Sequence, residues 1–389
     1  MTVPRSVDVV VVGAGMIGAA TAAALTAIGA GVCVVDRTGP LAGTTAAGEG
    51  NILVSDKAPG PELELALRSL DLWHTAAEEL GPGIEFEGKG GLVVAADQTQ
   101  FGALDAAAAG LRAGGVRAEP CDADALRALE PDLSPDLPGG MWFPQDSQVQ
   151  PMAAATAYLG RAVDRGATVV SDAPVLGLEV RSGRCTAVRT GKGTIDTGTV
   201  VLATGAWTGE LAQRLGRHAP VAPRRGHILV TEPVRPIVRH KVYEAGYVDT
   251  IATPEGRSCS AVVESTLSGT VLIGSSREFV GFDSSPDVAV LGELARRAIA
   301  LFPALYGVRA IRSYTGFRPA TPDNLPLIGP DPEVAGLLYA SGHEGAGIGL
   351  APATAELVTA FVTGARHAVD PAAFAPARFT RTTAVGEPA

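Results

Sequence analysis

The chain has 389 residues, and its 31 lysine and arginine residues against 41 aspartate and glutamate residues give a formal net charge of −10, which argues against a nucleic-acid-binding surface. Hydrophobic residues make up 46% and charged residues 19% of the sequence, which excludes intrinsic disorder for most of the chain and, at this length, predicts two folding units. The 48 glycines and 28 prolines follow no three-residue period, so they exclude collagen and predict many turns.

The first 36 residues predict a strand, a turn, a helix, a turn and a second strand. Four valines at 9–12 are typical of a buried strand, an alanine-rich segment follows, and 32–35 is again strand-like. No charged residue stands between Asp8 and Asp36, and a run of that length could span a bilayer. Its glycine breaks favour two buried parallel strands around a helix instead.

Three glycines and one acid in this unit form a dinucleotide-binding fingerprint. Gly13 permits the tight turn, Gly15 lets the backbone approach a pyrophosphate, and Gly18 allows the helix to pack closely on the strand. Asp36 ends the second strand, where it can accept hydrogen bonds from ribose hydroxyls. A glycine-rich turn without a ligand is the alternative, and the motif alone does not choose between NAD and FAD.

The rest of the chain predicts short helices and strands in alternation. A polar, glycine-rich loop covers 43–51, and strands dominate from 220 to 280. The expected helices are 61–80, 100–113, 122–129, 151–165, 287–302 and 351–362, and further strands are expected at 91–96, 167–170, 175–180, 187–190, 194–203 and 337–340.

This pattern predicts an α/β fold in which a Rossmann-like dinucleotide-binding domain is interrupted by an inserted, mainly antiparallel α+β substrate domain. The first domain is assigned to 1–80, 145–220 and 319–370, and the second to 81–144 and 221–318. The remaining 376–389 is expected to be a loose tail. Because segments of the two domains alternate along the chain, we expect the domains to lie against each other and to share a cleft.

The four cysteines stand far apart, without a second cysteine or a histidine at ligand spacing. They therefore predict no metal site and a reducing compartment. The N-terminal MTVPRSV has no features of a secretory leader, so we expect a cytoplasmic protein, with a peripheral position at the inner membrane face as an alternative.

Four segments taken together resemble the D-amino acid oxidase (DAO) family of FAD-dependent oxidoreductases. They are the fingerprint, TVVLATGAW (199–207), TGFRPATPDNLPLIG (315–329) and SGHEGAGIGLAPAT (341–354). The resemblance covers nearly the whole chain in the same order. GTTAAGEGNILVSDK (43–57) and RRGHILV (224–230) bring it closest to the branch of glycine oxidase, opine oxidase and D-hydroxyproline dehydrogenase.

The resemblance implies FAD as the cofactor, bound without a covalent link because no cysteine stands where sarcosine-oxidase relatives tether the flavin. The residues that it assigns to FAD are Gly13, Gly15, Met16, Ile17, Gly18, Asp36, Arg37, Thr44, Thr45, Gly48, Glu49, Gly50, Asn51, Val175, Thr204, Gly205, Trp207, Arg318, Gly342, His343, Gly345, Ala346, Gly347 and Ile348.

The resemblance also implies that Arg318, the arginine of the GxRP motif, binds the substrate carboxylate. A guanidinium suits a two-point contact with a carboxylate; a structural arginine paired with Asp323 is the alternative. His343 and an aromatic lid residue, Tyr247 or Tyr243, are further catalytic candidates, and His227 is expected near the flavin. Substrate size stays open, because glycine oxidase differs at 344–346.

The implied function is oxidation of a small amino or imino acid by hydride transfer from Cα to flavin N5, giving an imine. D-Amino acids such as D-proline or cis-4-hydroxy-D-proline are favoured. The alternatives are a glycine, sarcosine or opine oxidase that releases hydrogen peroxide, an electron-relay subunit of a larger dehydrogenase, and an NAD-dependent dehydrogenase. None of the four lysines matches the position that activates oxygen in sarcosine oxidase, so a partner subunit or a quinone-type acceptor is expected.

Overall fold

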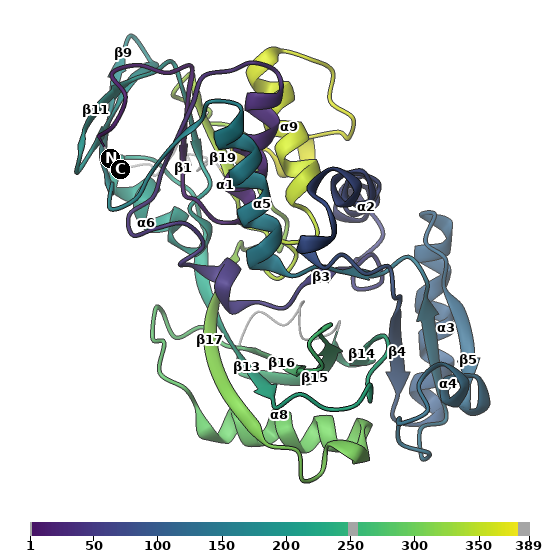
Figure 1. The fold of residues 1–389 in the computed structure, drawn as a ribbon. Helices are drawn as coiled ribbons and strands as arrows, with labels where there is room; N and C mark the ends of the chain where they lie inside the picture. Colours follow the sequence, from purple (N-terminus) through teal and green to yellow (C-terminus); the bar gives the residue numbers. More distant parts are fainter. Residues whose placement is uncertain (1, 248–255, 380–389) are drawn as a thin grey trace, which may run out of the picture.

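A computed structural model describes residues 2–247 and 256–379, and it contains two large β-sheets stacked as an upper and a lower part (Figure 1). The upper sheet has six strands in the order β18 (Leu327–Pro330), β19 (Leu337–Ser341), β12 (Thr199–Leu202), β1 (Val9–Val12), β2 (Val32–Val35) and β8 (Thr168–Val170). All neighbours are parallel except β18 and β19. The expected Rossmann-like arrangement is confirmed.

The valines of β1 show why this sheet is buried on both faces. Side chains alternate along a strand, so Val9 and Val11 pack into the helical layer while Val10 and Val12 pack into the opposite core. The helical layer consists of α1 (Met16–Ala27), α2 (Pro61–Leu80), α5 (Pro151–Asp164) and α9 (Ala351–Thr363).

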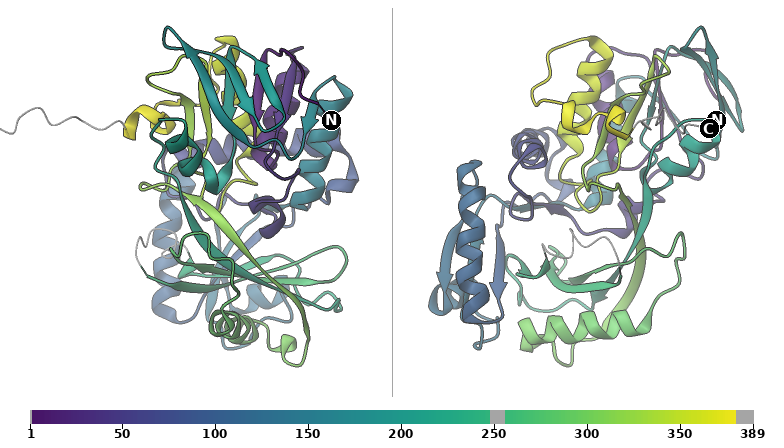
Figure 2. Two further views of the ribbon diagram at one scale, coloured as in Figure 1. Left: turned by 90° about the vertical axis from the view of Figure 1, so that its left-hand side faces the viewer. Right: turned by 180° about the vertical axis from the view of Figure 1, so that it is seen from behind.

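The opposite face is covered by a three-stranded antiparallel sheet and a short helix. These elements are β9 (Val175–Arg181), β10 (Arg184–Thr190), β11 (Gly193–Asp196) and α6 (Thr208–Arg214). Figure 2 shows this sheet and the helical layer on opposite sides of the parallel strands.

The lower sheet has eight strands and is antiparallel except where β4 meets β14. Its order is β17 (Ala310–Ala320), β13 (Ala222–Thr231), β16 (Val271–Arg277), β15 (Ser258–Ser265), β14 (Lys241–Glu244), β4 (Gly91–Ala95), β6 (Gly139–Phe143) and β5 (Glu119–Asp122). Two distant segments thus form one sheet. The division of the chain into two domains stays a prediction, which these sheet memberships support.

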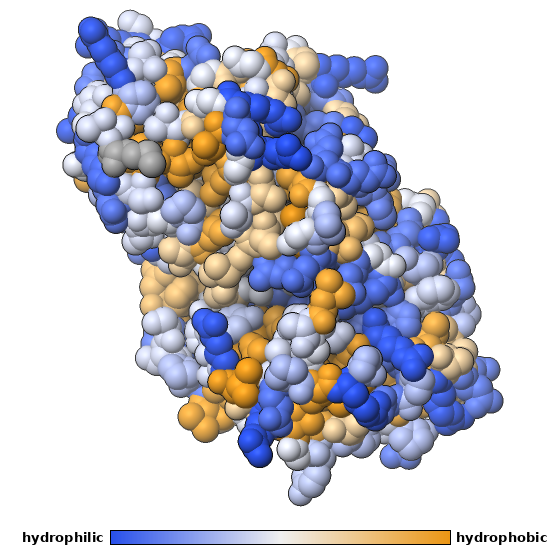
Figure 3. All heavy atoms as spheres, viewed as in Figure 1, coloured by the Kyte–Doolittle hydropathy of each residue, from blue (hydrophilic) through white to orange (hydrophobic). Residues whose placement is uncertain are grey.

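Helix α8 (Val288–Leu301) packs across β13, β15 and β16, while α3 (Gln98–Ala113) and α4 (Ala123–Leu129) lie beside β4–β6. The short ladder of β3 (Asn51–Ile52) and β7 (Ser147–Gln148) connects the two parts of the molecule. On the face in Figure 3, hydrophobic residues gather in the upper middle and in the lower part, and hydrophilic residues cover much of the periphery.

The described C-terminal residues correct one expectation. Residues 376–379 were expected to be loose, but they form the short 3-10 helix η6 (Pro376–Phe379), because Arg378 Nε donates to Asp323 Oδ2 over 2.8 Å. The rest of the expected tail, 380–389, lies outside the described residues. In the described part of the chain, every helix is too short or too polar to cross a membrane.

Candidate active site

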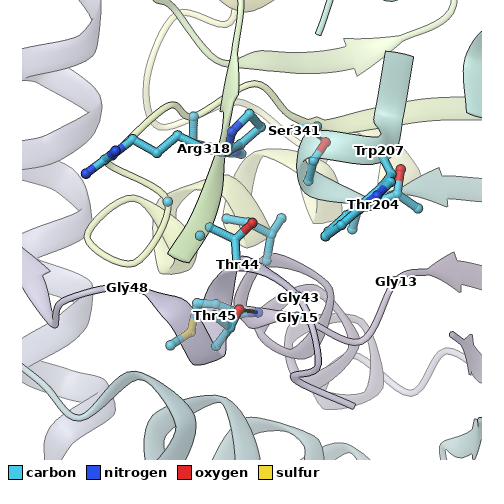
Figure 4. A pocket seen from close by; sticks show the side chains of 18 of the residues that line it. Gly13, Gly15, Gly43, Thr44, Thr45, Gly48, Thr204, Trp207, Arg318 and Ser341 are labelled. Carbon is cyan, nitrogen blue, oxygen red and sulfur yellow. Dashed lines mark hydrogen bonds between the residues drawn. The ribbon is translucent and has the colours of Figure 1, made fainter. Parts of the chain in front are cut away.

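One large pocket, of about 240 Å³, lies where the upper and lower parts meet. Its walls come from the β1–α1 turn, the loop after β2, the end of β12, the lower strands β13 and β17, and the turn before α9. In Figure 4, Arg318 lies on the left and Trp207 on the right, with Thr44, Thr45 and Gly15 between and below them. Arg318 comes from the lower sheet and Trp207 from the segment after β12 of the upper sheet, so the two sides of the pocket belong to different sheets.

The fingerprint wall is made of backbone because its glycines leave no space for side chains. Gly13 has φ +105°, and a Cβ there would lie 2.5 Å from the carbonyl oxygen of Ala203. A Cβ on Gly18 would lie 1.9 Å from the oxygen of Gly13, so Gly18 allows close helix packing as expected. Thr45 Oγ1 accepts the Met16 N–H at 3.0 Å, which holds the loop after β2 against the start of α1.

Asp36 is fixed at the end of β2 by two backbone donors. Its Oδ2 accepts the Ala14 N–H and its Oδ1 accepts the Thr38 N–H, both at 2.9 Å. The carboxylate lines the pocket. A carboxylate can accept about four hydrogen bonds, so these contacts orient Asp36 and leave acceptor sites for a ribose.

An aromatic group closes the pocket end near Asp36. Trp207 stacks on Phe282 with ring centres 5.2 Å apart and planes 7° apart, and the Arg37 guanidinium lies 4.1 Å from the centre of the Trp207 ring. Val175, at the start of β9, lines the same pocket. This end offers flat, apolar surface suited to an adenine ring.

The loop after β2 contacts the lower sheet. Its 3-10 helix η1 (Thr44–Ala47) lies on β17, and Thr44 Oγ1 donates to the carbonyl oxygen of Phe317 at 2.6 Å. Gly316 on β17 permits this approach, since a Cβ there would lie 2.6 Å from the oxygen of Ala47. The loop thus forms one wall for ligands bound by either domain.

The turn before α9 places His343 in the pocket wall. Its Nε2 lies 3.0 Å from Thr354 Oγ1, and burial lowers the pKa of His343 to about 3. The imidazole is therefore neutral at physiological pH. The first turn of α9 is satisfied within the protein: the Ala351 N–H donates to the carbonyl oxygen of Ile348 at 3.3 Å, Pro352 has no N–H, and the Ala353 N–H donates to Ser69 Oγ at 3.3 Å. The part of this region that lines the pocket is the preceding turn, with Gly345, Gly347 and Ile348.

Arg318 lies at the end of the pocket near the lower sheet. Its Nη1 donates to the carbonyl oxygen of Ser276 at 2.8 Å and its Nη2 to Ser275 Oγ at 3.4 Å. A guanidinium has five N–H donors, so within the described residues three donors remain for a ligand. Asp323 is paired with Arg378, so the alternative of a structural Arg318–Asp323 pair is wrong.

Glu344 lies next to Arg318, among three guanidinium groups. Its Oε1 lies 3.3 Å from Arg277 Nε, 3.6 Å from Arg224 Nη1 and 4.0 Å from Arg318 Nε. Burial would raise the pKa of Glu344, but these three guanidiniums hold it below its usual value. Tyr247 completes the cluster, because its hydroxyl accepts from Arg277 Nη2 at 3.2 Å.

The comparisons with known proteins agree with this geometry. A model of the DAO family, described as "FAD dependent oxidoreductase", matches residues 8–361. The chain belongs to the DAO family. By its description this is a family of FAD-dependent oxidoreductases, so FAD is the cofactor of the family.

Two curated relatives and one solved structure give the level of similarity. The chain is 34% identical over 202 residues to a glycine oxidase of Pseudomonas putida, covering 52% of each protein. It is 34% identical over 260 residues to hydrogen cyanide synthase subunit HcnC of Pseudomonas aeruginosa, covering 66% of this chain and 59% of that protein. Its alignments thus span about half the length of these relatives. A glycine oxidase structure from Geobacillus kaustophilus matches with a TM-score of 0.88 and 27% identity, covering 97% of this chain and all of that one.

The pocket fits the FAD of the DAO family on the evidence of its own residues. Glycine backbone at the start of α1, the oriented carboxylate of Asp36 and the flat Trp207 are suited to phosphate, ribose and adenine. The described cysteines do not line the pocket. That the flavin is bound without a covalent link stays a prediction.

Most residues assigned to FAD from the sequence line this pocket. They are Gly13, Gly15, Met16, Ile17, Asp36, Arg37, Thr44, Thr45, Gly48, Glu49, Asn51, Val175, Thr204, Gly205, Trp207, Arg318, His343, Gly345, Gly347 and Ile348. Four of the assigned residues do not line the pocket: Gly18, Gly50, Gly342 and Ala346. Gly50, for example, faces the backbone of Val149, between β7 and α5, since a Cβ on Gly50 would lie 1.7 Å from the carbonyl oxygen of Val149.

The structure also separates the two candidate lid tyrosines. Tyr247 lines the pocket, whereas Tyr243 is fully buried and donates to Ser55 Oγ. His227 was expected near the flavin, but its Nε2 accepts the Asp287 N–H at 3.1 Å, at the start of α8 on the other side of the sheet. Sequence reasoning did not predict the contact between Glu344 and Arg224. The acidic Glu344 in the GHEG turn could have indicated a buried charge that needs a basic partner.

Proposed function

We propose that the chain oxidises the Cα–N bond of a small amino or imino acid, with bound FAD as the acceptor of the hydride. The observation that carries the proposal is Arg318, a half-buried guanidinium that lines the pocket, has donors left over and has no carboxylate within 3.5 Å among the described residues. A bidentate pair with a substrate carboxylate would use those donors. Among substrates, D-proline and cis-4-hydroxy-D-proline are favoured by the branch that the sequence resembles.

The contribution of the protein in this proposal is positional. Arg318 is fixed by Ser275 and Ser276, so a carboxylate bound to it has a defined place relative to the FAD wall. Neutral His343, held by Thr354, adds a polar group without adding charge. Tyr247 covers the same end of the pocket.

The proposal is tested by anaerobic titration of the purified yellow protein. Candidate substrates are D-proline, cis-4-hydroxy-D-proline, glycine, sarcosine and opines, with loss of flavin absorbance near 450 nm as the readout. We expect at least one to reduce the flavin and the matching amine without a carboxylate to leave it oxidised. Reduction by dithionite but by no amino acid would overturn the proposal.

A second candidate function is that of a subunit in a larger dehydrogenase, favoured by the similarity to HcnC, which is named as a subunit. Within the described residues, the chain's lysines do not line the pocket. This supports slow reaction with oxygen and a partner subunit or a quinone-type acceptor. Stopped-flow reoxidation in air-saturated buffer tests the point, and reoxidation as fast as reduction would favour a peroxide-releasing oxidase. A cytoplasmic location stays a prediction.

A further inference from the structure

Three adjacent strands of the lower sheet carry glycines near Arg318, and two of them, Gly226 and Gly316, line the floor of the pocket. Gly316 on β17 pairs with Gly226 on β13, and Gly274 lies on the next strand, β16. Glycine within a strand marks a place where other atoms approach the backbone closely. Two charged groups make that approach here.

The first charged group is Arg318, which crosses over Gly226. A Cβ on Gly226 would lie 2.1 Å from Arg318 Nη1. The second is Glu49, from the loop after β2, which lies over Gly274. A Cβ on Gly274 would lie 2.4 Å from Glu49 Oε1.

Glu49 is unusual because its carboxylate is buried and only half satisfied. The residue is 8% exposed; Oε2 accepts the Asn51 amide at 3.2 Å, while Oε1 has no hydrogen-bond partner among the described residues. An unpaired buried oxygen of this kind is costly unless a ligand uses it. Glu49 lines the pocket, so a ligand can reach it.

The nearby lysine pairs with another residue, although Glu49 senses its charge. Lys241 forms a salt bridge with Glu264, and Glu264 Oε1 accepts the Gly50 N–H at 3.3 Å. The charge of Lys241 opposes the rise of the Glu49 pKa, but it gives Glu49 Oε1 no hydrogen bond. Within the described residues, Glu49 has no cation within 4.0 Å.

From these contacts we propose that Glu49 binds the amine of the substrate while Arg318 binds its carboxylate, so that the two residues hold an α-amino acid between them over the glycine floor. This inference rests on the proposed function. It assigns to Glu49 a role in substrate binding, and it identifies the substrate class as one with a basic nitrogen next to the carboxylate.

Both charged groups lie over the same short stretch of β16. Arg318 Nη1 donates to the carbonyl oxygen of Ser276, and Glu49 Oε1 lies over Gly274, two residues away in the sequence of that strand. The two groups are therefore placed side by side in the pocket region.

Glu49 can also hold a proton in this position. Burial raises its pKa, which Glu264 raises further, while Lys241, Arg318 and Asn51 oppose the shift. Tyr314 is the remaining titratable group that senses its charge. When a substrate ammonium binds, one N–H bond can break and one O–H bond form on Glu49, which leaves a neutral amine and a neutral acid. No electrons are exchanged in that step, and the neutral amine is the form that can become an imine.

The test uses two ligands of nearly equal shape that the enzyme does not oxidise. 2-Aminoisobutyrate has an ammonium group but no hydrogen on Cα, and pivalate has a methyl group in its place. Dissociation constants are measured on the FAD-loaded protein by flavin absorbance changes and by calorimetry. We expect Glu49→Gln to weaken 2-aminoisobutyrate about tenfold or more and to change pivalate binding less than twofold. Arg318→Lys is expected to weaken both.

Two further variants serve as controls. Glu49→Asp keeps the negative charge, so it is expected to retain part of the preference for 2-aminoisobutyrate over pivalate. If Glu49→Gln loses flavin, the affinities are measured on Glu49→Asp instead. Glu244→Gln removes a partly buried carboxylate that pairs with Arg297 and does not line the pocket, and it is expected to leave the ratio of the two affinities unchanged. If Glu49→Gln leaves the ratio of the two affinities unchanged while Arg318→Lys weakens both, Glu49 is not the amine site. If Arg318→Lys weakens neither, the proposed function itself fails.

Discussion

The two ends of the pocket are built in different ways. The FAD end consists of backbone at Gly13 and Gly15 together with Asp36, all within one 24-residue unit of sequence. The substrate end consists of charged side chains from three different elements: Glu49 follows η1, Arg318 lies on β17, and Glu344 lies in the turn before α9. The core of the FAD end thus comes from the β1–α1–β2 unit, whereas the substrate end depends on how the upper and lower sheets meet.

This difference predicts that the two ends can be damaged separately, and the largest effect is expected at Arg318. Arg318→Ala should lower kcat/KM by about 2 to 5 kcal/mol, or roughly 30-fold to several thousand-fold, because a desolvated charge pair is lost. Flavin should stay bound. Rapid-reaction measurement of flavin reduction checks this, with Arg312→Ala as control, since Arg312 is exposed on the same strand. Equal losses in both variants would contradict the role of Arg318.

At Asp36 we expect the opposite result, which is loss of FAD binding without loss of turnover per bound flavin. Asp36→Ala should weaken FAD binding by about 1 to 3 kcal/mol, because hydrogen bonds to a charged acceptor are lost. Flavin content after dialysis measures the effect. Turnover per bound flavin should be close to that of the wild type when FAD is added in excess. Full occupancy after dialysis would remove Asp36 from the cofactor site.

A third effect depends on pH and arises at His343. Its folded-state pKa of about 3 lies below the ordinary value near 6.5, so the unfolded chain binds a proton that the folded chain does not, and stability falls as pH falls through 6.5. At pH 5 this costs about 2 kcal/mol. Denaturation of His343→Gln at saturating FAD should show that much less loss between pH 8 and pH 5. His74→Gln, at an exposed position, should behave as the wild type, and an unchanged acid sensitivity in His343→Gln would be inconsistent with a neutral buried imidazole.

The smallest effect tests the glycine floor. Gly226→Ala places a Cβ where Arg318 Nη1 lies, so the guanidinium must shift; we expect KM to rise about tenfold, or about 1.4 kcal/mol, with flavin retained. Gly292→Ala on α8 is the matched control, because a Cβ there meets open space. Steady-state kinetics of both variants distinguish a local clash from a general cost of losing glycine. An unchanged KM in Gly226→Ala would show that Arg318 does not depend on the floor.

The same contrast explains what the sequence could predict. The β1–α1–β2 unit was predictable because hydrophobic strands, glycine spacing and an acid lie next to one another. The position of His227 was predicted wrongly, although strand alternation shows the reason: Gly226 faces the pocket, so His227 must face α8. Pairing of Asp323 with Arg378 depended on a C-terminal turn that was expected to be loose.

The substrate end was predictable only in part. Arg318 was identified through the resemblance to the DAO family, but its partners Ser275 and Ser276 lie on another strand. Glu49 was assigned to FAD because it lies in the loop after β2, and its position over Gly274 follows only from the meeting of the two domains. Such contacts leave no periodic pattern in the sequence.

A crystal structure of the FAD-loaded protein with 2-aminoisobutyrate tests the central claim most directly. The account predicts the ligand carboxylate within hydrogen-bond distance of Arg318 and its nitrogen within hydrogen-bond distance of Glu49 Oε1, over Gly226 and Gly274. A ligand whose carboxylate instead binds Arg277 or Arg312, or whose nitrogen points away from Glu49, would contradict it.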